Sequence, residues 1–171
     1  MMPDEEIIKI KRALEEHEQR IGKLESFLRQ GEGKPTKEIS ADIERHIEEL
    51  SKDAGITEEE LRCIFDFEKE DLNLITTGEG KNEAEKQFKA TICILTAYHY
   101  CYGRDEISSQ DLRKKLQWLG IKSLQTLSSS LANYKQLILP KGKPKSPKFA
   151  YKITYPGIKK GLEIIKELAI A

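Results

Sequence analysis

The sequence has little that would place it in a membrane or in an oxidising compartment. Aromatic residues make up only 7% of its 171 residues, with a single tryptophan. No apolar run approaches the ~18 residues that a membrane-spanning helix needs. The first six residues are acidic rather than basic and lack the apolar run of a signal peptide. We therefore predict a cytoplasmic protein that has no membrane partner.

Signals of catalysis and of metal binding are also scarce. The three cysteines, Cys63, Cys93 and Cys101, lack the paired spacing of a metal site and are typical of reduced thiols. The run GEGK at residues 78–81 lacks the first glycine and the following Ser or Thr of a phosphate-binding loop. No pair of carboxylates stands out as general acid and base. The sequence predicts no enzyme, no metal site and no cofactor.

A net charge of zero conceals two halves of opposite sign. Residues 1–80 carry 12 basic and 22 acidic side chains, whereas residues 81–171 carry 17 basic and 7 acidic ones. The acidic excess falls within residues 36–80, and the window 112–162 holds 12 basic residues and no acidic one. Solvated surfaces normally mix both signs, so this window predicts contact with a polyanion. The alternatives are a lysine-rich loop that serves solubility, or one that binds the acidic residues.

Heptad spacing predicts a coiled-coil helix over residues 1–30, followed by a linker over residues 31–37. The apolar steps alternate three and four residues, with His17 at the one polar position. This pattern favours a homodimer, and the alternative is a single amphipathic helix packed on its own domain. The predicted dimer contacts are Ile7, Ile10, Leu14, Ile21, Leu24 and Leu28.

Residues 38–80 are expected to form a small acidic unit that resembles a helix–turn–helix in its spacing. Gly55 can end the first helix, and Thr57 with Glu60 matches a capping box for the second. The apolar face of the second helix would extend to Phe65. Because this helix begins with three glutamates, it would repel phosphates. The unit is therefore expected to contact a protein partner or to pack within the fold, rather than to bind DNA.

Residues 81–171 are expected to form the third unit. Asn82 can cap a buried helix that runs to about Tyr102, and Ser108 or Ser109 can cap the next. Trp118 is expected to pack near the core, with an exposed anchor for a partner as the alternative. The other expected elements are a third helix over Ser123 to Tyr134, strands at 137–139 and 149–154, a basic loop at 140–148, and a last helix from Pro156.

The run DLRKKLQWLGIKSLQTLSSSL over residues 111–131 resembles the helix–turn–helix of winged-helix proteins, and residues 137–154 resemble the wing. The likeness covers residues 84–155. It implies a fold that is mostly α with a small β-wing, completed by the coiled-coil helix and the acidic unit. One departure is a proline-rich wing loop. The positions that fill the helix–turn–helix pattern are Leu112, Leu116, Gly120, Ile121, Leu124, Leu127 and Leu131.

The resemblance implies that the third helix enters the major groove of duplex DNA while the wing touches the backbone. That helix has short polar side chains but no Arg or Lys of its own, so wing lysines would supply most of the affinity. The chain is thus expected to be a transcriptional regulator; the alternative is an adaptor that docks proteins. The candidate nucleic-acid contacts are Lys122, Ser123, Gln125, Thr126, Ser129, Asn133, Lys141, Lys143, Lys145 and Lys148.

Overall fold

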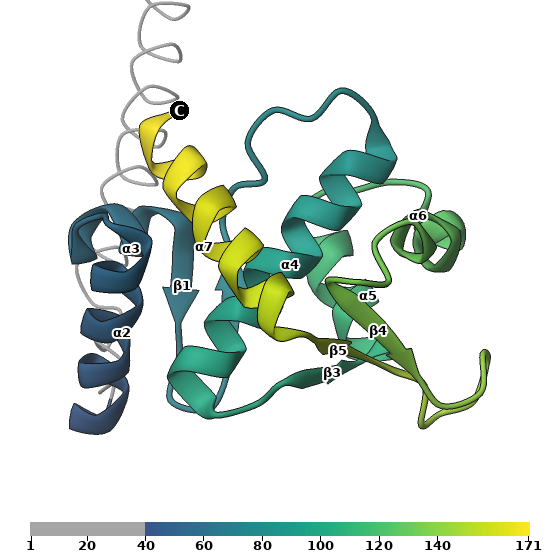
Figure 1. Cartoon of the computed structure of the whole chain (residues 1–171), viewed down its shortest axis with the longest axis horizontal. Helices are drawn as coiled ribbons and strands as arrows, with labels where there is room; N and C mark the ends of the chain where they lie inside the picture. Colours follow the sequence, from purple (N-terminus) through teal and green to yellow (C-terminus); the bar gives the residue numbers. More distant parts are fainter. Residues whose placement is uncertain (1–39) are drawn as a thin grey trace, which may run out of the picture. The chain divides into compact units, whose positions relative to one another are not determined.

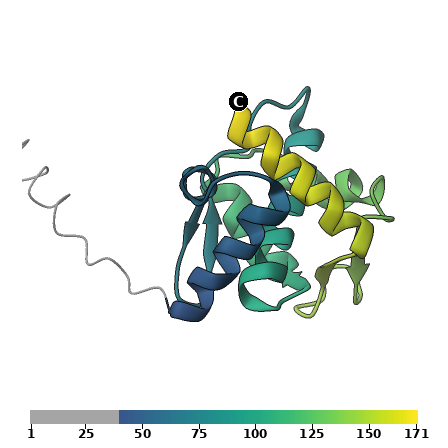
Figure 2. The ribbon, with the colours of Figure 1, turned by 60° about the vertical axis from the view of Figure 1, so that its left-hand side comes forward.

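Side-chain caps set the start of several helices in the computed structural model, which describes residues 40–171 (Figure 1; Figure 2). Thr57 and Glu60 form the predicted capping box. The side-chain oxygens of Asn82, Ser108 and Thr154 each accept a hydrogen bond from a backbone N–H in the first turn of the following helix. Such caps satisfy N–H groups that have no partner within the helix. The sequence therefore predicts the caps at Thr57, Asn82 and Ser108, whereas the last helix, expected from Pro156, begins at Tyr155 after a cap at Thr154.

Helices account for more than half of the described residues, and two small antiparallel sheets supply the strands. The prediction of many helices and few strands is confirmed. None of the described helices is long and apolar enough to cross a membrane. The elements are α2 (Ala41–Ala54), α3 (Glu58–Ile64), β1 (Phe65–Phe67), β2 (Leu72–Leu74), α4 (Glu83–Tyr102), β3 (Glu106–Ser108), α5 (Ser109–Trp118), the 3-10 turn η1 (Leu124–Thr126), α6 (Leu127–Ala132), β4 (Ile138–Lys141), β5 (Ala150–Ile153) and α7 (Tyr155–Ile170).

The larger sheet has the strand order β3-β5-β4, and both of its pairings are antiparallel. Tyr151, in the central strand, lies opposite Ile107 on one side and Pro140 on the other. Tyr151 and Ile153 are buried, whereas Lys152 between them is exposed. From Tyr151 to Ile153 this alternation is the one that the sequence predicts for a half-buried strand, but Ala150, expected on the exposed face with Lys152, is buried as well.

The central helix is α4, and α2, α6 and α7 pack against it. Eight consecutive residues of α4, from Thr91 to Tyr98, are buried, so the predicted central position of this helix is confirmed. Where α7 crosses α4 (Figure 1), a side chain on Gly161 would collide with Thr96 and would lie only 3.2 Å from the carbonyl oxygen of Ile92. The two helices therefore approach each other at a residue that has no side chain.

The expected boundary between residues 80 and 81 does not divide the fold. Apolar side chains of α2, α3 and β1–β2 share one buried cluster with those of α4 and α7, and the described residues form one compact unit. Tyr100 Oη donates to Asp53 Oδ2 at 2.5 Å, and Tyr102 Oη donates to the Glu68 carbonyl at 2.6 Å. The sign of the surface charge changes at residue 80, but the core continues across it.

Two local predictions need correction. The second helix of the acidic unit ends at Ile64, and Phe65 begins strand β1, because the buried–exposed–buried pattern of Phe65–Phe67 pairs with Leu72–Leu74. Trp118 does not pack in the core; it is 59% exposed at the end of α5.

The predicted coiled-coil helix over residues 1–30 lies outside the described residues. The same holds for its six apolar dimer contacts and for the linker over residues 31–37.

Candidate nucleic-acid interface

A groove of about 650 Å³ runs between the start of α5, the η1–α6 segment and the loop that joins β4 to β5. We call β4, β5 and this loop, residues 138–153, the lysine hairpin. The groove has two cations, one on α5 and one on the hairpin, and no carboxylate lines it. Its walls can therefore accept a polyanion without a repulsive side chain. The lining residues are Ser109, Gln110, Arg113, Gln125, Ser128, Pro144, Lys145, Ser146, Pro147 and Phe149.

Tight turns order the tip of the lysine hairpin. Ser146 N–H donates to the Lys143 carbonyl at 3.1 Å, which closes a four-residue turn around Pro144 and Lys145. Lys145 has φ 65°, and a positive φ after proline is typical of a type II turn, in which glycine is the favoured residue. The turn thus holds a lysine at a strained position that faces the groove.

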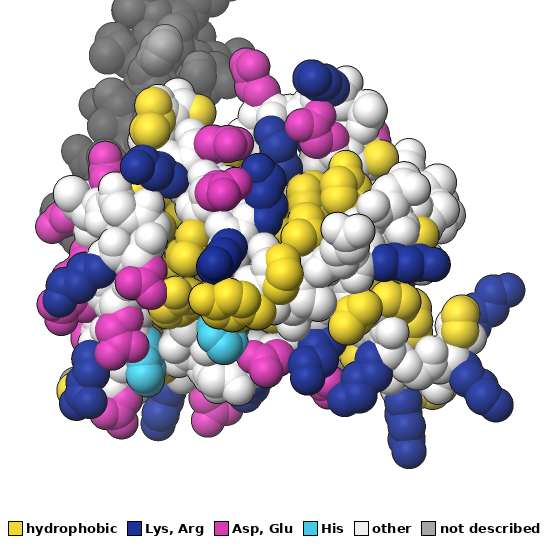
Figure 3. All heavy atoms as spheres, in the orientation of Figure 1, with side chains coloured by type: hydrophobic (Ala, Val, Ile, Leu, Met, Phe, Trp, Pro, Cys, Tyr) yellow, Lys and Arg dark blue, Asp and Glu magenta, His cyan; other side chains and the backbone are white. Residues whose placement is uncertain are grey.

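Lysines gather at the hairpin end of the molecule, whereas carboxylates gather over α2 and α3 on the other side (Figure 3). Lys143, Lys145 and Lys148 are exposed, and none of them forms an ion pair with a described carboxylate. Lys141 differs, because its Nζ lies 2.6 Å from Glu106 Oε2. Three free ammonium groups at the tip are thus available to phosphates.

The turn before α6 departs from the prediction at Ser123. This residue has φ 58° and makes no side-chain cap. The expected helix from Ser123 to Tyr134 is instead a 3-10 turn, η1, followed by the six-residue α6. Thr126 contributes to the break, because its hydroxyl donates to the Ser123 carbonyl at 2.8 Å and so supports a turn in place of a helix.

All ten predicted contact residues are exposed, but the structure brings only some of them together. Gln125 and Lys145 line the same groove from opposite walls. The hydroxyls of Thr126 and Ser129 each donate to a backbone carbonyl within their own segment. Asn133 lies along a different hollow, which two carboxylates also line. The groove therefore contains only two of the ten predicted contact residues, Gln125 and Lys145.

Five polar residues of the groove were not among the predicted contacts, and one of them is Ser146 in the hairpin loop. Ser109 and Gln110 lie at the start of α5, and Arg113 follows one turn later. Ser128 lies within the predicted third helix, and its hydroxyl is 2.9 Å from Tyr151 Oη. Arg113 belongs to the acid-free window, which is the one sequence signal that could have indicated it.

Lys115 anchors the helix α5 that forms one wall of the groove. Its Nζ donates to Asp71 Oδ1 at 2.8 Å, to the Leu72 carbonyl at 2.6 Å and to Asn73 Oδ1 at 3.3 Å. Tyr98 Oη also donates to Asp71. Burial raises the pKa of Asp71, but the hydrogen bonds from Lys115 and Tyr98 outweigh it and hold this pKa below its usual range. Lys115 is thus used within the fold and is not available to DNA.

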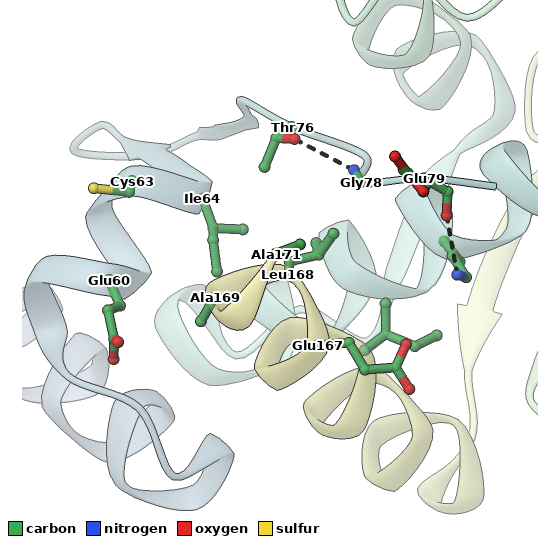
Figure 4. A pocket seen from close by; sticks show the side chains of 12 residues that line it. Glu60, Cys63, Ile64, Thr76, Gly78, Glu79, Glu167, Leu168, Ala169 and Ala171 are labelled. Carbon is green, nitrogen blue, oxygen red and sulfur yellow. Dashed lines mark hydrogen bonds between the residues drawn. The ribbon is translucent and has the colours of Figure 1, made fainter.

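A larger hollow, of about 880 Å³, lies elsewhere, between α3, the loop at residues 75–80 and the end of α7 (Figure 4). Its carboxylates, Glu60, Glu79 and Glu167, lie apart around the rim and would repel phosphates. Within residues 40–171, no cluster of His, Cys, Asp and Glu is placed to hold a metal ion. The smaller groove is therefore the better candidate for binding phosphates, because two cations and no carboxylate line it.

Comparison of the chain with protein-family models, with curated proteins and with solved structures found no match. The function is therefore inferred from the geometry and charge of the described residues.

Proposed function

We propose that residues 84–155 form a winged-helix domain and that the chain is a cytoplasmic regulator that binds duplex DNA. The observation that carries this proposal is the groove without carboxylates, with polar side chains of the η1–α6 segment on one wall and the lysine hairpin on the other. The succession of α4, α5, the η1–α6 segment, β4 and β5 along the chain follows the order of helices and wing strands that the winged-helix resemblance implies, and β3 pairs with β5 in the same sheet. Two copies joined through residues 1–30 would present two such grooves.

The two walls would have different roles. Free ammonium groups on Lys143, Lys145 and Lys148 would neutralise phosphates, which gives affinity without sequence preference. Gln125 carries an amide that can pair with a base edge, adenine above all. Because α6 has only six residues, few side chains can reach bases. We therefore expect strong dependence on salt and modest dependence on sequence.

A salt titration of full-length protein tests this proposal. Fluorescence anisotropy would measure binding to a labelled random-sequence duplex between ~50 and ~200 mM salt. The test variant replaces Lys143, Lys145 and Lys148 with Gln. Its matched control replaces three exposed lysines that lie away from the groove, Lys52, Lys69 and Lys166, with Gln.

The hairpin variant should bind all sequences more weakly, and its salt slope should fall by about one for each lost phosphate contact. The control should bind like the wild type, although its net charge changes equally. Absence of wild-type binding at low salt would refute DNA binding. Equal weakening in both variants would show that net charge, and not the hairpin, drives the interaction.

The exposed Trp118 favours the adaptor as a second candidate. It lines a hollow of about 730 Å³ on a different face of α5 from the groove. Tryptophan is over-represented among residues that dominate the energy of protein–protein binding. If the wild-type chain binds no DNA and Trp118→Ala abolishes association with a protein partner, the adaptor is the better description.

A further inference from the structure

Gln87 on α4 is completely buried, yet its side chain reaches the backbone just before η1. Its Nε2 donates to the carbonyls of Ser123, at 3.1 Å, and of Lys122, at 3.3 Å. Its Oε1 is buried and has no hydrogen-bond partner. Rotating the amide by half a turn would set that oxygen against two carbonyl oxygens, so the two contacts fix its orientation.

Two further side chains hold the same turn. Glu83 Oε2 accepts a hydrogen bond from the Lys122 N–H at 3.2 Å, and Arg113 Nη1 donates to the Leu124 carbonyl. Three consecutive residues, 122–124, are therefore held by polar groups from α4 and α5. Ser123 has φ 58°, a conformation that serine adopts only where its surroundings enforce it.

We infer that Gln87 is a positioning residue for DNA recognition: it fixes the turn at residues 122–124 so that Gln125 enters the groove. This inference rests on the proposed DNA-binding function. The stability of the fold alone does not explain why an amide occupies position 87. A buried oxygen without a hydrogen-bond partner makes the folded state less stable than an apolar side chain would. Lys122 and Ser123 are exposed, so water could hydrate their carbonyls if the amide were absent.

A double-mutant cycle tests the inference in the full-length protein. The variants are Gln87→Met, Gln125→Ala and their combination, and the control is Thr96→Val, which alters another buried polar residue of α4 that does not touch the turn. We expect Gln87→Met to weaken binding to a duplex about three- to tenfold and the double variant to bind no more weakly than Gln87→Met. Thr96→Val should bind like the wild type. Additive losses, or wild-type binding by Gln87→Met, would overturn the inference.

Amide hydrogen exchange supplies a readout that does not depend on DNA. Gln87→Met should accelerate exchange at residues 122–126 and leave α7 unchanged. Glu83→Ala, at a half-exposed site, should accelerate exchange over the same residues without disturbing the core. Unchanged exchange in both variants would show that Gln87 and Glu83 do not hold the turn at residues 122–124, and would overturn the inference even if the chain binds DNA. Absence of wild-type DNA binding would instead refute the proposed function, and with it the role of Gln87 in recognition.

Discussion

Lys115 on α5 and Asp71 before β2 form an ion pair across the boundary between the basic and the acidic half of the chain. Their Nζ and Oδ1 atoms are 2.8 Å apart, and the Lys115 side chain is only 9% exposed. Tyr98 on α4 donates to the same carboxylate. Three elements thus meet at one carboxylate, which attaches a wall of the groove to the acidic end of the fold.

Removing either partner of this pair should have unequal effects. Asp71→Ala leaves a buried ammonium without its counter-charge and should destabilise the fold by about 2 kcal/mol, less than for a fully buried pair because Asp71 is half-exposed. Lys115→Met leaves only that half-exposed carboxylate and should cost less. Urea unfolding of both variants measures the difference. A larger loss in Lys115→Met would show that the ammonium, and not the carboxylate, is the indispensable partner.

The same pair predicts a pH dependence. Because the pKa of Asp71 is lowered in the folded state, its contribution to stability is present above the unfolded value, near 3.8, and is lost as pH falls through the folded value. The stability gap between the wild type and Asp71→Ala should therefore be constant near neutral pH and narrow below about pH 4. Urea unfolding across that range measures it. A gap that widens toward low pH would contradict the ionised form of Asp71 in the fold.

The shared core predicts where the chain can be divided. A fragment of residues 82–171 would expose the apolar faces of α4 and α7 that α2, α3 and β2 cover. It should aggregate or unfold without cooperativity, whereas residues 39–171 should unfold in one cooperative transition. Circular dichroism during thermal unfolding distinguishes them. Cooperative unfolding of the shorter fragment would show that the acidic end is dispensable.

Replacing Lys145 with Gly should change the stability of the fold and the affinity for DNA in opposite directions. Lys145→Gly relieves the positive φ at the turn and should stabilise the fold by about 1 kcal/mol, while it weakens binding to DNA. Lys145→Gln removes the charge without relieving the backbone, so it should weaken binding and leave stability unchanged. Thermal unfolding and anisotropy on the same samples give both quantities. If Lys145→Gly binds DNA like the wild type, the ammonium at the tip does not contact phosphate.

Trp118 reports which face of α5 meets DNA. It is the single tryptophan, and it lines the hollow on the face that does not border the groove. Its fluorescence should be quenched freely by acrylamide, as expected of an exposed indole, and saturation with duplex DNA should not protect it. Strong protection would mean that DNA binds the other face of α5, and the proposed groove would then be wrong.

Local signals predict much of the fold. Thr57 with Glu60, Asn82 and Ser108 are predictable as caps because a cap joins residues only three positions apart. Ser123 shows the limit of this reasoning. It has the residue type of a cap, yet its backbone conformation accompanies a contact with Gln87, 36 residues away. A pattern of neighbours along the chain cannot indicate such a partner.

The candidate site likewise depends partly on properties of single residues and partly on contacts between distant ones. The acid-free window identifies the lysines, since charge is a property of each residue type. For two of them the partner is distant in sequence: Asp71 binds Lys115 and Glu106 binds Lys141, whereas Lys143 and Lys145 lie at the hairpin tip.

By itself, the sequence determines the helix starts at Thr57, Asn82 and Ser108, the alternation from Tyr151 to Ile153 and the separation of charge along the chain. Only the tertiary structure decides that the two oppositely charged halves share one core, with lysines gathered at the hairpin end and carboxylates over α2 and α3 (Figure 3). The reason is physical: caps and alternation depend on neighbours along the chain, whereas burial and ion pairing depend on residues that folding brings together.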